Sequence, residues 1–104
     1  MDPQECFDGL VTTLRDRPGV ELPDPTRRTF GARTLRVHGS IFAMVQDEAL
    51  VVKLPEARVA ELLAEGTGRP FGNRPMKEWV SVPEVAPRIW LALAEEALAF
   101  VGRA

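Results

Sequence analysis

Apolar residues near each end of the chain recur every three or four positions, which is the spacing of one face of a helix. The first stripe follows Asp2 and Pro3, which suit an N-cap and a first helical residue. The second begins near Pro87 and ends before Gly102. The pattern predicts a helix at each end, with these residues on the buried faces: Cys6, Phe7, Leu10, Val11, Leu14, Trp90, Leu93, Ala94, Ala97, Leu98 and Val101.

Between these helices the hydrophobic period changes to two. Apolar and polar residues alternate at 34–38, 50–54 and 76–82, which is typical of strands with one buried face. Residues 41–46 are apolar on both faces, as in a central strand, and residues 20–22 predict a further short strand. Short turns at 39–40 and 47–49 make neighbouring strands antiparallel. A third helix is predicted from Pro55 to about residue 65, with Val59, Leu62 and Leu63 buried.

The order of these elements predicts an α+β fold. Helix, three strands, helix, strand and helix indicate two layers, with an antiparallel sheet of about four to five strands and helices packed on one face. The chain has 104 residues, which is enough for one core and too few for two. We therefore expect a single domain spanning residues 1–104.

The composition is that of an ordinary globular protein, with 45% hydrophobic and 27% charged residues and a net charge of −2. One cysteine excludes an intrachain disulfide and fits a reducing compartment. No apolar run approaches the roughly 20 residues that span a bilayer, and the N-terminus shows no basic signal region. These features predict a cytoplasmic protein that does not bind membranes.

The residues that most often carry chemistry are scarce. His38 is the only histidine and Cys6 the only cysteine, whereas a zinc site needs three or four ligands. Cys6 lies on the apolar stripe of the first helix, where a small buried hydrophobe is the commoner role than a nucleophile. The glycine-rich residues 66–72 follow a helix rather than a strand, so they do not match a phosphate-binding loop. We expect no enzymatic activity, no cofactor and no metal.

The charges nevertheless suggest one surface. Arg36, His38, Lys53, Lys77 and Trp79 fall on the strands and could share the sheet face away from the helices, with Phe42 or Met44 joining them according to register. Such a basic face with an aromatic residue is one way in which proteins hold a nucleic-acid backbone and stack bases. The alternative is that Trp79 is core and the charges form a solvated outer face. The candidate residues for nucleic-acid or partner binding are Arg27, Arg28, Arg33, Arg36, Lys53, Lys77 and Trp79.

An ordered set of short motifs resembles the TfoX N-terminal-domain family and the related YjbR/MmcQ-like proteins. The motifs are Phe30-Gly31, Gly39, Ile41-Phe42-Ala43, Val51-Val52-Lys53-Leu54 and Trp79-Val80. The resemblance implies a compact α+β domain on a curved antiparallel sheet, and a link to the regulation of competence genes and to DNA. It implies no catalytic residues. From these 104 residues we expect no counterpart of the C-terminal helical domain of full-length regulators of this type.

Three functions therefore compete. The leading hypothesis is a non-enzymatic regulatory or binding domain with DNA as its partner. The alternative is a protein-interaction module or homodimer that uses an uncovered sheet face or edge. An enzyme or small-molecule binder is the third, and it requires an enclosed pocket with convergent polar groups.

Overall fold

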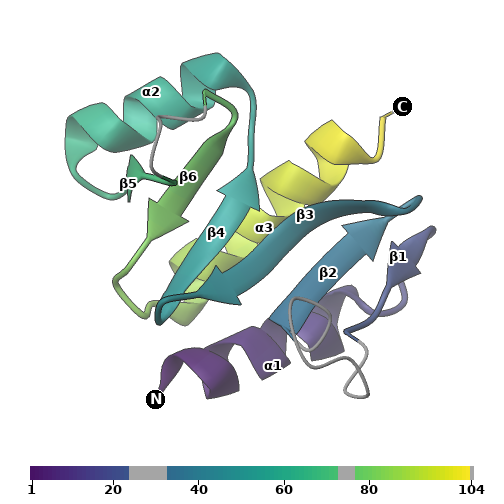
Figure 1. The fold of residues 1–104 in the computed structure, drawn as a ribbon. Helices are drawn as coiled ribbons and strands as arrows, with labels where there is room; N and C mark the ends of the chain where they lie inside the picture. Colours follow the sequence, from purple (N-terminus) through teal and green to yellow (C-terminus); the bar gives the residue numbers. More distant parts are fainter. Residues whose placement is uncertain (24–32, 73–76, 104) are drawn as a thin grey trace.

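The computed structural model describes residues 1–23, 33–72 and 77–103. Six strands form one antiparallel sheet in the order β1-β2-β3-β4-β6-β5, accompanied by three helices (Figure 1). The elements are α1 (Pro3–Leu14), β1 (Val20–Glu21), β2 (Thr34–Val37), β3 (Ser40–Gln46), β4 (Ala49–Lys53), α2 (Glu56–Glu65), β5 (Arg69–Pro70), β6 (Trp79–Val82) and α3 (Pro87–Val101). The predicted α+β fold is confirmed, with more strands than expected.

The helix ends follow local sequence signals. Asp2 accepts a hydrogen bond at its Oδ1 from the amide of Glu5, at 2.8 Å, and this caps α1. Pro87 occupies the first position of α3, where a missing amide hydrogen leaves no bond unmade. Gly66 ends α2 in the left-handed conformation, with φ of 81°.

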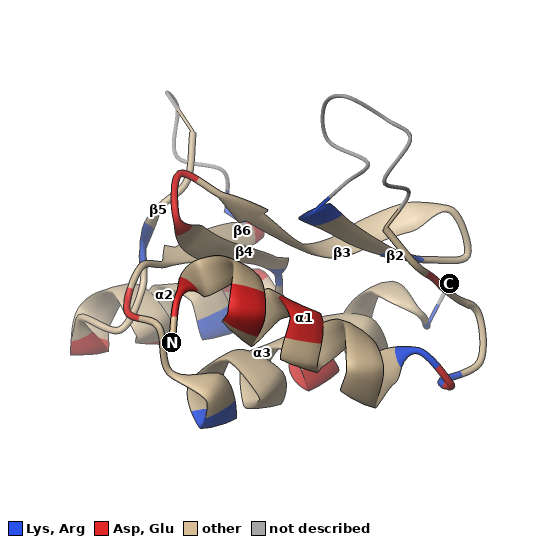
Figure 2. Ribbon diagram, turned by 90° about the horizontal axis from the view of Figure 1, so that it is seen from below, with Lys and Arg blue, Asp and Glu red and all other residues tan. Residues whose placement is uncertain are grey.

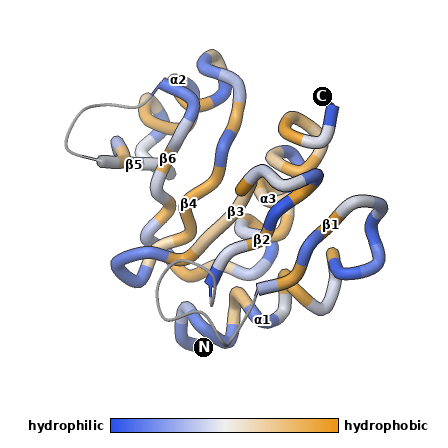
Figure 3. Tube along the Cα trace, turned by 45° about the vertical axis from the view of Figure 1, so that its right-hand side comes forward, coloured by the Kyte–Doolittle hydropathy of each residue, from blue (hydrophilic) through white to orange (hydrophobic). Residues whose placement is uncertain are grey.

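All three helices pack on one face of the sheet (Figure 2). α3 packs across β3 and β4, α1 lies beside α3, and α2 contacts β5 and β6. Trp90 of α3 is fully buried, and its indole N–H donates to the carbonyl oxygen of Glu84 at 2.8 Å. Hydrophobic residues concentrate on β3, β4 and α3 (Figure 3), so the core lies between the sheet and its helices.

A β-bulge in β3 settles which residues share a face. Leu35 pairs with Ala43 while Arg36 pairs with Ile41, so Phe42 has no partner on β2. Phe42 and Ala43 both join the core as a result. Of the two residues that the alternation left open, Met44 therefore lies on the face away from the helices, and Phe42 does not.

Several predicted details were wrong. The fourth predicted strand begins at Trp79, so Lys77 lies in the preceding turn rather than on a strand. The glycine-rich loop contains β5, which two residues and a proline do not reveal. Leu63 is 38% exposed, because Val59 and Leu62 hold the face of α2 that meets the core. His38 lies in a turn with φ of 50°, not on a strand.

The two edges of the described sheet are its shortest strands. β1 and β5 have two residues each, and Pro70 supplies no amide hydrogen at one edge. Among the described helices, none is long and apolar enough to cross a membrane.

Candidate functional site

The sheet face opposite the helices, here called the open face, is ordered into two lines of residues. Register partners across five strands form the first line: Thr34, Met44, Val51, Ser81 and Arg69. The second line has two parts: Glu21, Arg36 and Ile41 across β1, β2 and β3, and Lys53 with Trp79 across β4 and β6. Since register partners point to the same side of a sheet, Arg36, Lys53 and Trp79 share the open face.

The two lines differ in burial. Met44 and Val51 of the first line are 8% and 1% exposed, although neither belongs to the core beneath the helices. Arg36, Lys53 and Trp79 of the second line are half-buried. Within the described ranges, no helix lies on the open face (Figure 2). Solvent therefore reaches the line that holds the cationic and aromatic groups.

Trp79 lies at the junction of the open face and α2. Its ring faces that of Phe71, with centroids 6.2 Å apart and planes tilted by 45°. On the α2 side a cavity of about 200 Å³ is lined mainly by apolar side chains, among them Val59, Leu63 and Pro70, with Trp79 as one wall. Trp79 is thus neither a core residue nor a freely exposed one.

A second, shallower hollow of about 440 Å³ brings two of the predicted cations to Trp79. It is lined by Lys53, Glu56, Lys77, Glu78 and Trp79. Two ammonium groups and two carboxylates balance one another in charge there. The hollow therefore combines charged groups of both signs with one aromatic ring.

Charge is divided between the two layers of the fold. The helices contain seven acidic residues against Arg58 and Arg88, whereas the strands contain Arg36, Lys53 and Arg69 against Glu21 alone. Red segments along α1 are visible on the helix side of the sheet in Figure 2. The open face is therefore more basic than the net charge of −2 indicates.

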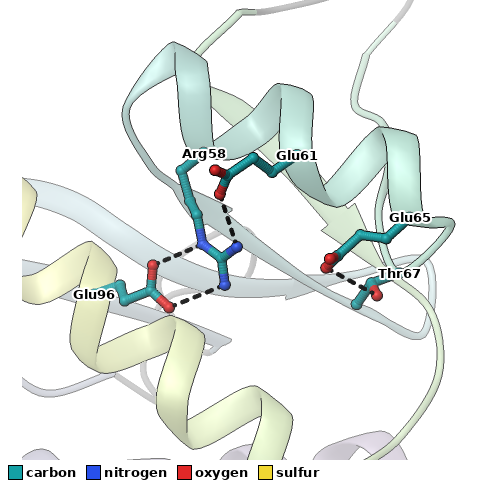
Figure 4. A network of polar contacts seen from close by, with 5 residues as sticks. All are labelled: Arg58, Glu61, Glu65, Thr67 and Glu96. Carbon is teal, nitrogen blue, oxygen red and sulfur yellow. Dashed lines mark hydrogen bonds and ion pairs between the residues drawn. The ribbon is translucent and has the colours of Figure 1, made fainter.

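Carboxylates pair with two arginines on the helix side of the fold. Arg17 contacts Glu95 at 2.9 Å, and Arg58 contacts Glu96 at 2.9 Å and Glu61 at 3.0 Å (Figure 4). The hydrogen bond to Glu96, and then that to Glu61, raises the pKa of Arg58. In the part of the chain that the structure describes, the following cations have no carboxylate within ion-pair distance: Arg15, Arg33, Arg36, Lys53, Arg69, Lys77, Arg88 and Arg103.

The structure places most of the predicted residues. Arg36, Lys53 and Trp79 share the open face, Lys77 joins the hollow beside Trp79, and Arg33 is exposed just before β2. Arg27 and Arg28 lie outside the described residues. The sequence reasoning missed four residues around Trp79, namely Glu56, Leu63, Phe71 and Glu78. Only Leu63 gave a signal, as an apolar residue at the margin of its helical stripe.

Among the described residues, neither Cys6 nor a cluster of metal-ligating side chains forms a reactive centre. Cys6 is 3% exposed, and desolvation raises the pKa of its thiol, which opposes the formation of a nucleophilic thiolate. Among the residues placed in the structure, no three His, Cys, Asp or Glu side chains come together as a metal site would require.

Comparison with known proteins gives one match. A sequence model described as the TfoX N-terminal domain matches residues 24–101. No curated protein and no solved structure matches the chain.

Proposed function

The chain belongs to the TfoX N-terminal domain family, and on that premise we propose that it is a regulatory binding domain without catalytic activity. Its partner is nucleic acid, which it contacts through the open face of the sheet. Arg36 and Lys53 meet phosphates, and Trp79 stacks on a base. Its proposed setting is the cytoplasm, where its one thiol would stay reduced.

The division of charge between the layers is the observation that supports this proposal. The helices contain seven of the fifteen acidic residues against two arginines, and carboxylates of α3 pair with Arg17, just after α1, and with Arg58 of α2. Arg36 and Lys53 remain without such partners among the described residues, on the same face as Trp79. Cations that the protein itself does not neutralise remain available to phosphates.

The spacing of these groups suits an extended strand. β3 separates β2 from β4, so the backbones that carry Arg36 and Lys53 are about 10 Å apart. Trp79 is the direct register partner of Lys53 on β6. A backbone that crosses the strands would meet Arg36, then Lys53, and would bring a base to the ring of Trp79.

Fluorescence anisotropy with short, mixed-sequence DNA tests the proposal, using single-stranded and duplex probes. Affinity is expected to fall steeply between about 50 and 200 mM salt, because bound phosphates release counterions. Arg36→Gln and Lys53→Gln should each reduce the slope of log K against log salt by about 0.7 with single strands. Arg88→Gln, which removes the same charge from an exposed position on α3, should leave the slope unchanged.

Two results would overturn nucleic-acid binding. One is the absence of binding at low salt, and the other is an affinity that does not depend on salt. If the open face instead joins two copies of the chain, sedimentation equilibrium would show a dimer that Trp79→Glu dissociates. That outcome would support the alternative of a protein-interaction module, which also predicts no DNA contact by Arg36.

A further inference from the structure

A further hollow, distinct from the two beside Trp79, lies on the helix side of the sheet and away from the open face. It measures about 260 Å³ and is bordered by the segment after α1, the turn between β2 and β3, and the end of α3. Arg17, His38 and Arg103 line it, one from each of these three segments. Nitrogen-bearing side chains that are far apart in sequence thus converge on one small volume.

Apolar groups complete the lining. Val37, Leu98 and Ala99 border the same hollow, and Val37 belongs to the core of the protein. A ligand there would meet aliphatic carbon on one side and hydrogen-bond donors on the other. This combination is typical of sites for small organic molecules that carry one charged group.

The imidazole of His38 packs closely against the backbone of Gly19. Gly19 has φ of 80°, and a Cβ on it would overlap Cε1 of His38, so the ring lies directly against the backbone. The amide of His38 also donates to the carbonyl oxygen of Gly19 at 3.1 Å. The ring borders the hollow, and an imidazole carries an N–H donor in either protonation state.

The lining of the hollow contains two arginines and no carboxylate. Arg103 has no carboxylate within ion-pair distance among the described residues, and Arg17 shares its charge with Glu95, at 2.9 Å. The C-terminal ends of α1 and α3 lie nearby and carry partial negative charge, which stabilises the arginines and weakens any bound anion. Arg103 and His38 remain the donors whose capacity the protein does not use.

We propose that this hollow binds a small organic anion with a short aliphatic body. Arg103 and Arg17 hold the oxyanion, since a guanidinium matches the planar geometry of a carboxylate and also binds phosphate. His38 donates a third hydrogen bond. The aliphatic body lies against Leu98 and Ala99. The site is separate from the open face, because none of its lining residues belongs to the two lines of that face.

NMR titration of the full chain at constant ionic strength tests the site. The probes are isovalerate, which has both parts, inorganic phosphate, which lacks the aliphatic body, and 3-methylbutanol, which lacks the charge. Isovalerate should shift the amide signals of Val37, His38, Ala99 and Gly102 and bind more tightly than either of the other two. Phosphate binding equal to isovalerate would show that the oxyanion alone is recognised and would overturn the apolar half of the proposal.

Two pairs of variants make the test specific. Arg103→Ala should weaken isovalerate binding roughly tenfold, as expected for the loss of a charge-assisted hydrogen bond. Arg88→Ala, at the other end of α3, should have little effect. Ala99→Glu should abolish binding by placing a carboxylate in the hollow, whereas Ala92→Glu adds the same charge at another exposed position of α3. Equal binding of 3-methylbutanol, or equal losses in each pair, would overturn the site.

Discussion

Arg58 of α2 binds both carboxylate oxygens of Glu96 on α3. Its Nε lies 2.9 Å from Oε1 and its Nη2 lies 3.3 Å from Oε2, while Nη1 reaches Glu61 within its own helix at 3.0 Å (Figure 4). This two-pronged contact ties α2 to α3, two helices that lie far apart in the sequence. It fixes α2 beside β6, and α2 in turn forms one wall of the cavity at Trp79.

The contribution of this pair to stability should be modest. Its side chains are 32% and 42% exposed, so solvent screens the attraction. A double-mutant cycle with Arg58→Ala and Glu96→Ala, followed by urea unfolding, should give a coupling of about 0.5–1 kcal/mol. The matched cycle with Glu61→Ala should give only about 0.3–0.5 kcal/mol, as for neighbouring residues on one exposed helix. A Glu96 coupling below that of Glu61 would contradict this ranking.

Gly19 and Gly39 offer a matched test of backbone strain against steric overlap. Both have positive φ, of 80° and 83°, but a Cβ at Gly19 meets the ring of His38, whereas a Cβ at Gly39 meets nothing within 4 Å. Gly39→Ala should lower the free energy of unfolding by about 1 kcal/mol, the usual penalty of the left-handed conformation. Gly19→Ala should lower it further, and adding His38→Ala should recover the difference. Equal losses at the two glycines would show that the ring moves aside freely.

Burial of Cys6 makes stability depend on alkaline pH. The thiol's pKa is raised above its ordinary value of 9.0 in the folded protein, because desolvation disfavours the thiolate. Above about pH 9 the unfolded chain loses this proton while the folded chain retains it, so stability should fall as pH rises. Urea unfolding of the wild type and of Cys6→Ala should show this decline in the wild type only. A thiol reagent should label the wild type at a rate that increases with urea.

The titration of Asp2 makes the stability of α1 depend on pH in the acidic range. The hydrogen bond from the amide of Glu5 lowers the pKa of Asp2, so the charged carboxylate stabilises the folded state above its ordinary pKa near 3.8. That contribution is lost as pH falls through the lower pKa of the folded state. Thermal unfolding followed by circular dichroism should show a smaller acid-induced decrease in Asp2→Asn, which keeps an oxygen acceptor but has no charge to titrate. Identical acid profiles would contradict the role of the charge.

The alternation of residues predicted much of this arrangement, and particular local features explain the rest. The alternation of apolar and polar residues correctly placed Trp79 and Ser81 on one face and Val80 and Val82 on the other, because β6 is regular. It could not place Phe42, because the bulge that turns this residue into the core arises from pairing with β2. The alternation could not predict the residues around Trp79 either. They depend on α2 packing against β6, which joins residues from three separate segments.

The short outer strands affect how readily the protein aggregates at high concentration. A long, flat outermost strand offers a row of free amide and carbonyl groups that can template another chain and seed fibrils. Here β1 and β5 offer two residues each, and Pro70 interrupts the donors of β5. The described margins of the sheet therefore offer few backbone groups from which cross-β growth could start.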